Sequence, residues 1–262
     1  MKKLLLFASF SFLIGCDNSE EIKLELPEHD EQLAVECYLE DGKPMRAFLS
    51  QSVGYFENES IDMKGAYFKI SSPDGDHVLK NENIEDPDYK KFYNYVSENT
   101  INIKPGDVLE VFVEDELGRK IRGTTKALEK VEIDTVMYKF HNSNQTSPII
   151  FFHDDPNEKN YYRLTFSKLK SGIIEQDLVI DDYLFNGNGI LNAGYSFYRG
   201  DHIEINLFHI DEKYYEYLKS IQGAKNANFS AFTQPYPISS TVDEGIGVFT
   251  VLIYDRITMK LE

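Results

Sequence analysis

The chain has 262 residues, with 27 basic and 44 acidic side chains, a net charge of −17 at pH 7 and 42% hydrophobic residues. So acidic a chain is excluded from binding nucleic acid through a phosphate-neutralising surface, and it is unsuited to lying flat on anionic lipid. The apolar content is sufficient for a packed core, and the length corresponds to one large domain or two small ones.

The N-terminus has the order of residues found in secretory signal peptides. Lys2 and Lys3 precede an apolar run over residues 4–14, which is too short to span a bilayer because a membrane helix needs about 20 residues. The run ends in Gly15-Cys16, which resembles the lipobox of bacterial lipoproteins, where the thiol receives a diacylglycerol group. We therefore predict a signal peptide over 1–15 and a lipidated Cys16; an ordinary signal peptide with a chance cysteine is the alternative.

An acidic segment follows the cysteine and includes Asp17, Glu20 and Glu21. Such a run is usually a solvated, charged tether. It also resembles the signal that sends Bacteroidota lipoproteins to the outer face of the outer membrane, and the two interpretations are compatible. We predict a lipidated acidic tether over 16–27 and a lipid-anchored protein on the outer membrane that faces the cell exterior.

Short alternating apolar runs between turn residues predict β-strands over the next hundred or so residues. The first run, 33–39, places Cys37 on its apolar face, so we expect this thiol to be buried and inert. This rhythm predicts an immunoglobulin-like β-sandwich over 28–127, although a barrel would produce the same pattern. The other predicted strands are 46–51, 66–70, 77–79, 100–103, 108–114 and 120–125.

A polar segment at 124–134 predicts a joint, after which we expect a second β-rich domain over 128–262. Both faces of its last run are apolar, which predicts a central strand covered on both sides. The expected fold class is thus mostly β, with two β-sandwich-like domains and one or two short helices. The predicted strands of the second domain are 131–140, 149–153, 161–167, 176–181, 204–209 and 247–261.

Two segments have apolar residues at helical spacing. One is predicted to form a helix near 211–222, with Asp211 as its N-cap and Gly223 as its end. The other, 86–98, fits a helix and a strand equally well.

Motifs that carry enzyme chemistry are missing from the sequence. The six histidines form no HExxH pair, and the chain has neither a Gly-rich phosphate loop nor a G-x-S-x-G elbow. We therefore predict that the protein is not an enzyme and uses no cofactor.

Two acidic clusters are weak candidates for a metal site. Asp154, Asp155, Asn157 and Glu158 offer the oxygen ligands that Ca²⁺ prefers, but Pro156 among them favours a simple turn. We expect the turn and no metal. The second cluster, equally unspecific, comprises Glu175, Gln176, Asp177, Asp181 and Asp182.

Aromatic residues in loop-like segments either bind a ligand or close the end of a sandwich. They include Tyr195, Phe197, Tyr198, Phe232 and Tyr236. The segment 186–189 reads as a hairpin or loop tip.

Seven segments, taken in order, resemble one family. They are 33–39, 125–134, 154–163, 182–187, 214–218, 228–229 and 247–249. The family consists of Bacteroidota surface lipoproteins catalogued as domain of unknown function 4249. Its members are often encoded beside SusC-type TonB-dependent receptors, and it has no established catalytic residues.

The resemblance implies a surface-exposed outer-membrane lipoprotein that acts as a non-enzymatic accessory or binding subunit of a TonB-dependent (SusC-type) transport system. Its expected partners are outer-membrane lipid, through the acyl anchor, and a TonB-dependent receptor. A structural or adhesin-like surface protein that binds host or matrix partners is the alternative. A surface hydrolase acting through dispersed carboxylates is a third hypothesis.

Overall fold

The structure is a computed structural model that describes residues 30–54, 61–86, 91–185, 187–192, 194, 196–228, 234 and 236–261. Residues 1–30 and 31–262 are separate units, and the fold below is that of the second unit. The predicted signal peptide, Cys16, and the residues Asp17, Glu20 and Glu21 therefore lie outside the described residues. Within the described part of the chain, no helix is long and apolar enough to cross a membrane.

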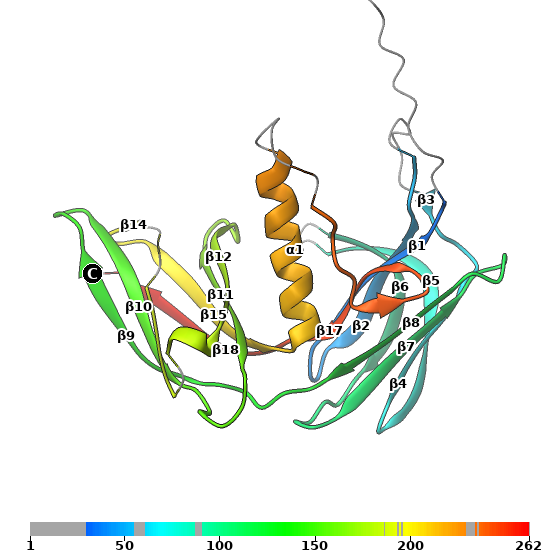
Figure 1. Ribbon diagram of the computed structural model, residues 1–262, viewed down its shortest axis with the longest axis horizontal. Helices are drawn as coiled ribbons and strands as arrows, with labels where there is room; N and C mark the ends of the chain where they lie inside the picture. The colour runs from blue at the N-terminus through cyan, green and yellow to red at the C-terminus, as the bar shows by residue number, and fades with distance from the viewer. Residues whose placement is uncertain are drawn as a thin grey trace, which may run out of the picture. The chain divides into compact units, whose positions relative to one another are not determined.

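In the first sandwich, neighbouring strands are hydrogen-bonded in the order β8-β7-β4-β5-β6-β2-β1, and β3 pairs with β2 (Figure 1). Strand β5 pairs with β4 through residues 75–79 and with β6 through residues 80–86, so it connects the strands β8-β7-β4 to the strands β6-β2-β1. The strands are β1 (Leu33–Leu39), β2 (Pro44–Gln51), β3 (Ile61–Asp62), β4 (Tyr67–Ser72), β5 (Gly75–Asp86), β6 (Lys91–Thr100), β7 (Val108–Glu114) and β8 (Lys120–Lys126).

Alternating side chains of these strands fill the first core. Strand β1 has the bounds that its alternation predicts, and Cys37 is fully buried, where burial raises the pKa of its thiol to about 12. In the ambiguous segment 86–98, the described residues lie in strands: Asp86 ends β5, and residues 91–98 belong to β6. Its Tyr95 stacks on Phe68 with ring centroids 5.4 Å apart, and its Asn94 bonds both the backbone N–H and C=O of Leu49.

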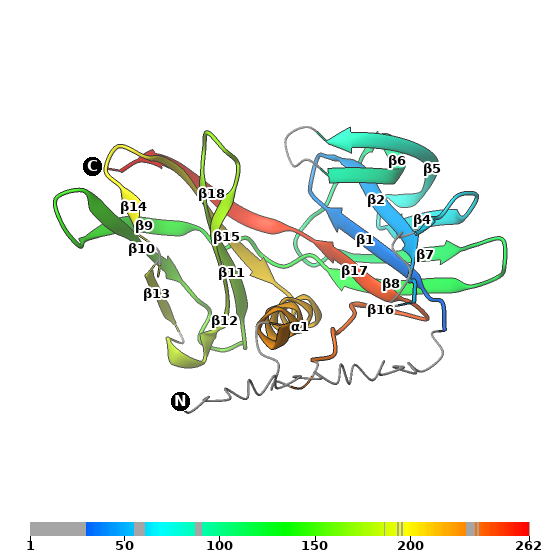
Figure 2. The same ribbon diagram turned by 90° about the horizontal axis from the view of Figure 1, so that it is seen from above.

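The last strands of the chain return to this first sandwich. β17 (Ile246–Val251) pairs in parallel with β1, and β16 (Val242–Asp243) pairs with β8. The predicted single run at 247–261 is wrong, because it is two strands, β17 and β18 (Ile253–Lys260), separated by Leu252 (Figure 2). β17 is buried on both faces as predicted, but it ends the order of paired strands and is not central. The domain boundary at 127/128 stays a prediction.

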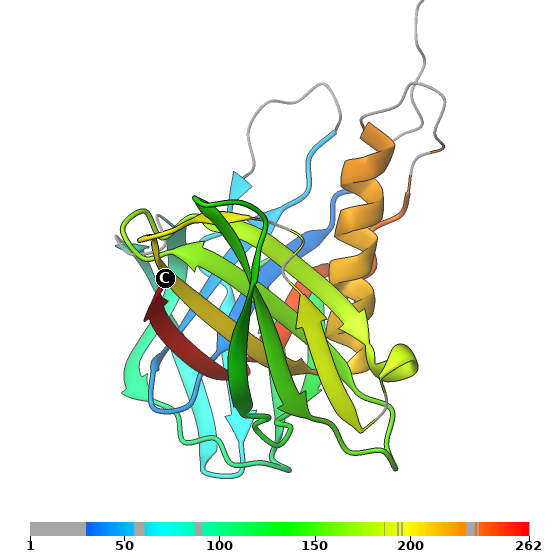
Figure 3. The same cartoon turned by 90° about the vertical axis from the view of Figure 1, so that its left-hand side faces the viewer.

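Two four-stranded sheets form the second sandwich (Figure 3). One contains β9 (Ile133–Phe140), β10 (Gln145–His153), β13 (Asn188–Asn192) and β14 (Phe197–Tyr198). The other has the order β12-β11-β15-β18, with β11 (Tyr161–Lys168), β12 (Ile174–Asp181) and β15 (His202–Ile210). Their inward faces supply the core with Phe152, Leu164, Phe166, Ile205 and Leu207, among others. A short 3-10 helix, η1 (Asp182–Leu184), follows β12.

Helix α1 (Glu212–Asn228) packs on β11, β12 and β17 and stands between the two sandwiches (Figure 1). Asp211 caps it as predicted, because its Oδ1 accepts from the Tyr214 N–H at 2.7 Å. The predicted end at Gly223 is wrong. A Cβ at Gly223 would lie 2.9 Å from the ring of Tyr236. The missing side chain at this position within the helix therefore lets the ring pack against it. The predicted fold class, mostly β with two sandwiches and a helix, is confirmed.

Candidate functional site

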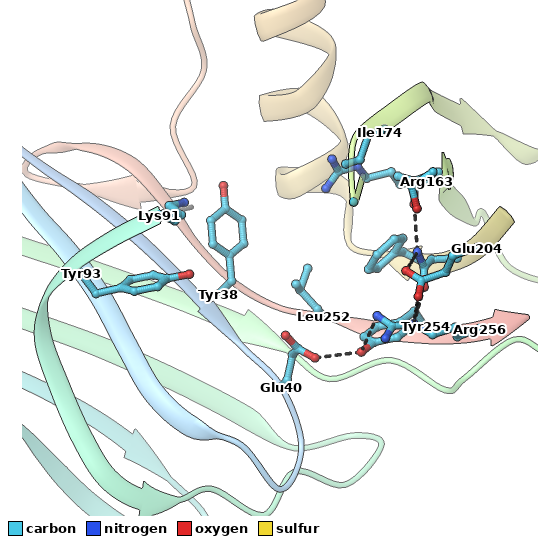
Figure 4. Close-up of a pocket in the computed structure, with 15 residues that line it drawn as sticks. Tyr38, Glu40, Lys91, Tyr93, Arg163, Ile174, Glu204, Leu252, Tyr254 and Arg256 are labelled. Carbon is cyan, nitrogen blue, oxygen red and sulfur yellow. Dashed lines mark hydrogen bonds and ion pairs between the residues drawn. The ribbon is translucent and has the colours of Figure 1, made fainter. Parts of the chain in front are cut away.

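A cavity of about 400 Å³ lies against the outward face of β11, β15 and β18, with β1 and β6 on its other side (Figure 4). Because side chains alternate along a strand, one face of β11 and β15 is apolar and packs in the second core, whereas the other face carries polar side chains and lines the cavity. Tyr162, Leu164 and Phe166 point into the second core, whereas Arg163, Thr165 and Ser167 line the cavity. The cavity therefore has a polar floor built on a strongly apolar sheet.

The polar floor is a connected row of hydrogen bonds. Thr165, Asn206 and Arg256 are register partners on neighbouring strands. Arg256 Nε donates to Asn206 Oδ1 at 2.7 Å. Asn206 Nδ2 in turn donates to Glu204 Oε1 at 3.1 Å and to Thr165 Oγ1 at 3.3 Å. This network fixes the rotamer of Asn206 and presents the polar edges of its neighbours to the cavity.

Arg163 borders the floor next to α1. Its Nε and Nη2 donate to the two carboxylate oxygens of Asp177 at 2.9 and 2.8 Å, and its Nη1 donates to the Tyr214 hydroxyl at 3.0 Å. Burial works against the charge of Arg163, but the bonds to Asp177 raise its pKa above the ordinary value. The guanidinium also lies 5.7 Å from the centroid of the Phe208 ring. Arg163 is thus a fixed cation.

The facing wall comes from β1 and β6 and is rich in tyrosine (Figure 4). Lys91 forms an ion pair with Glu36 at 2.5 Å. Its ammonium lies 4.8 Å from the ring centroid of Tyr38 and 5.9 Å from that of Tyr93, so both rings hold the cation. Burial raises the pKa of the Tyr38 hydroxyl above its usual range, which keeps it neutral.

One hydrogen bond joins the two sides at the bottom of the cavity. The Tyr254 hydroxyl, on β18, donates to Glu40 Oε2 at 2.9 Å, just beyond the end of β1 (Figure 4). Arg256 reaches the same hydroxyl at 3.3 Å, with its guanidinium 5.0 Å from the Tyr254 ring centroid. Leu252, between β17 and β18, also lines the cavity. The short link between these two strands therefore fixes the distance between the walls.

The first predicted acidic cluster is split between a buried network and a turn. Asp154 is buried, and its Oδ1 accepts from Asn160 Nδ2 at 3.0 Å and from the Tyr162 hydroxyl at 2.5 Å, while its Oδ2 accepts from the Gly187 N–H at 3.0 Å. Asp182 accepts from the Asn160 N–H at 2.7 Å. We call these five residues the Asp154 network. Both oxygens of Asp154 are thus occupied by protein donors.

The neighbouring residues form the turn that the sequence favours. Asp155 Oδ1 accepts from the backbone and side-chain nitrogens of Asn157 at 2.9 and 2.8 Å, and these bonds lower the pKa of Asp155. The carbonyl of Glu158 accepts from Asn160 at 3.3 Å. Among the residues with a described placement, no three His, Cys, Asp or Glu side chains are grouped so that they could hold a metal ion.

The second predicted acidic cluster is not brought together around one point. Asp177 serves as the counterion of Arg163, Asp181 caps η1 through the Tyr183 N–H at 3.4 Å, and Asp182 belongs to the Asp154 network. Asp177, Asp181 and Asp182 thus each have a separate structural partner.

The aromatic residues of the loops take separate roles. Phe197 is fully buried, with its ring 6.2 Å from that of Phe166, so it closes the second core. Tyr198 is exposed, with Lys168 at 5.8 Å from its ring. Tyr236 covers Gly223, while Tyr195 and Phe232 lie outside the described residues, as does Asn186 of the predicted loop tip.

The chain matches the family model described as Domain of unknown function (DUF4249) over residues 19–257. The chain belongs to this family. Among curated proteins, none matches it.

Two similar solved structures are both from chicken. The two-domain fibronectin type-III segment of tenascin is 12% identical with a TM-score of 0.23, and the match covers 70% of this chain and 92% of that one. The FN1–FN3 domains of CNTN1 are 8% identical with a TM-score of 0.29, and the match covers 88% of this chain and 67% of that one. Likenesses with TM-scores this low add nothing to the fold described above and nothing about function.

Proposed function

We propose that the protein is a lipid-anchored, non-enzymatic binding subunit that works beside an outer-membrane transporter of the TonB-dependent (SusC) type. The observation that carries the binding function is the cavity, with its polar floor and tyrosine-rich wall. Protein ligand sites are concave, with a few placed polar groups among apolar and aromatic surfaces. At about 400 Å³, this cavity lies within the usual range of such sites.

The state of the charged side chains favours binding over reaction. Lys91 pairs with Glu36, Arg163 with Asp177, and Arg256 with Asn206 and Tyr254. A general acid or base needs a proton to move at the working pH, and a nucleophile needs an adjacent base. Side chains held in mutual pairs keep their charge and position, as is useful for recognition.

The anchor and the location follow from the sequence. Cys16 lies at the cleavage point of a lipobox-like signal, and the acidic residues Asp17, Glu20 and Glu21 resemble a surface-export signal. One acyl chain holds only marginally, whereas the two or three of a bacterial lipoprotein anchor stably. The net charge of −17 keeps the folded part away from anionic lipid, so the contact with the membrane is made by the anchor.

Co-purification from outer membranes tests this function. The tagged, membrane-anchored protein is extracted in mild detergent and captured, and we expect a β-barrel receptor to be recovered with it in a fixed molar ratio. Protease added to intact cells should digest the anchored protein. Recovery of the protein alone, or its protection in intact cells, would contradict the proposal.

The adhesin-like alternative has one observation in its favour. The outward face of β9, β10 and β13 carries neighbouring apolar residues, of which Met137 is 54% and Ile190 57% exposed. A face of this kind suits a protein partner. Capture of a host or matrix protein in place of the receptor would favour this second function.

Replacing Cys16 by serine should abolish membrane attachment, because the thiol is the acyl acceptor at the cleavage point. The variant should remain as the uncleaved precursor or be released as a soluble protein, whereas the wild type partitions into the detergent phase of a Triton X-114 extract. Cys37→Ser provides the control, since this buried thiol lies in the first core. A cleaved Cys16→Ser variant that still enters the detergent phase would disprove lipidation at this position.

A further inference from the structure

We infer that the cavity binds an uncharged, polyhydroxylated ligand, the chemistry of a short saccharide. The inference rests on the proposed binding function and specifies the class of ligand. Its first support is the polar floor, where Thr165, Asn206 and Ser167 are only 3, 6 and 7% exposed. Burying polar groups costs free energy, and a face that served only for packing would be apolar, like the opposite face of the same strands. The polar floor fits a ligand that exchanges hydrogen bonds with it.

The second support is the balance of charge. The cations of the lining already have carboxylate or polar partners within the protein, and Glu40 accepts from Tyr254. A ligand with a net charge would have to disrupt one of these pairs or remain without a counter-charge, and an unpaired charge in a partly desolvated site is costly. A neutral ligand avoids this cost and still finds donors and acceptors.

The third support is the pairing of flat aromatic surfaces with polar edges. Tyr38 and Tyr93 line one side, while Asn206, Glu204 and Arg256 line the other. A sugar ring has an apolar C–H face, which packs on an aromatic ring, and hydroxyl groups that both donate and accept. The two sides of the cavity match these two surfaces of a sugar.

The topology disfavours a peptide at this place. Extended peptides usually add to an open sheet edge, where unpaired backbone groups hold them. The floor is instead the face of β11 and β15, and each of these strands is paired on both sides. The ligand must therefore be bound by side chains, as saccharides are.

Calorimetric titration of the full-length, detergent-solubilised protein tests the ligand class. The probes are neutral trisaccharides of glucose, galactose, mannose, xylose and N-acetylglucosamine, beside a mixed tripeptide library and a trimer of galacturonate. We expect at least one neutral trisaccharide to bind. Arg256→Ala and Tyr93→Ala should each weaken that binding by about tenfold, the usual effect of one good polar or stacking contact.

Two matched variants serve as controls. Arg122 also lies 5.0 Å from an aromatic centroid, that of Phe112, and pairs with Glu244, but it lies away from the cavity. Tyr67, on β4, is exposed and contacts Phe112. Arg122→Ala and Tyr67→Ala should leave the affinity unchanged.

The outcomes separate this inference from the proposed function. If no neutral trisaccharide binds at millimolar concentration, or if tripeptides or the galacturonate trimer bind more tightly, the ligand class is wrong, and co-purification with the receptor still stands as the test of the function. If a trisaccharide binds equally well to Arg256→Ala and Tyr93→Ala, the cavity is not its site. If a trisaccharide binds but no receptor is recovered, the transporter role fails and the ligand class holds.

Discussion

Gly247→Ala is expected to destabilise the fold more than any other substitution considered, by about 4 kcal/mol or more. Gly247 has a φ of +118°, a region that residues with a Cβ rarely adopt. A Cβ there would lie 2.0 Å from the backbone oxygen of Val35, its register partner in the parallel pairing of β1 with β17. Since the obstacle is backbone, β17 would have to separate from β1. The urea midpoint of the purified variant should fall far below that of the wild type.

Gly42→Ala is the matched control for this prediction. Gly42 also has a positive φ, +68°, but nothing lies within 4 Å of a Cβ built there. This variant should lower the free energy of unfolding by about 1–2 kcal/mol, which is the cost of a left-handed backbone conformation for a residue with a Cβ. Equal losses for the two variants would show that the close contact with Val35 contributes nothing.

Asp154→Ala is the second substitution with a large expected effect, on the order of 4 kcal/mol. Removing this carboxylate leaves the Tyr162 hydroxyl and the Gly187 N–H without the acceptor that each has in Asp154. The Asn160 side chain loses the same acceptor but keeps the carbonyls of Asp155 and Glu158. Buried donors without partners cost about 1–3 kcal/mol each. Urea unfolding followed by tyrosine fluorescence and far-ultraviolet circular dichroism measures the loss.

Asp155→Ala should cost less than about 1 kcal/mol, because this neighbouring carboxylate only closes an exposed turn. The same pair of variants tests the calcium alternative. Neither Ca²⁺ nor EDTA should shift the midpoint of the wild type, whereas a true site would add about 2.7 kcal/mol at a hundred times its Kd. A Ca²⁺-selective rise that both variants abolish would overturn the turn interpretation.

The alternation of apolar and polar residues was enough to predict most strands, because a few consecutive residues already show which side chains face the core and which face outward. The bounds of β1 follow directly from the pattern of 33–39. Tertiary contacts decide the features that were missed. Gly223 is of the residue type that often ends a helix, but it lies inside α1, where the ring of Tyr236 packs over it. The parallel pairing of β17 with β1 has no local signature, because it depends on residues from opposite ends of the chain.

The candidate site could be predicted only in part, for the same reason. Residues 154–163 stand out as a motif, and they supply Arg163 and three members of the Asp154 network, namely Asp154, Asn160 and Tyr162. The cavity itself is assembled from β1, β6, β11, β15 and β18, so its members are scattered through the sequence. One signal existed within β11, where Arg163, Thr165 and Ser167 alternate with large apolar residues. Such alternation normally indicates a solvated face, and the structure shows that this face is covered.

Strands β16 and β17 come late in the chain but pair with β8 and β1 of the first sandwich. No single cut in the chain can therefore separate the two sandwiches. A break in the segment between β8 and β9 would leave the N-terminal fragment without β16 and β17, and the C-terminal fragment would carry two strands that lack their partners. The last strand of the first sandwich, β17, ends 125 residues after the end of β8, and contacts so distant in sequence form slowly. The pairing of β1 with β17 therefore forms only when strands from both ends of the described chain are present.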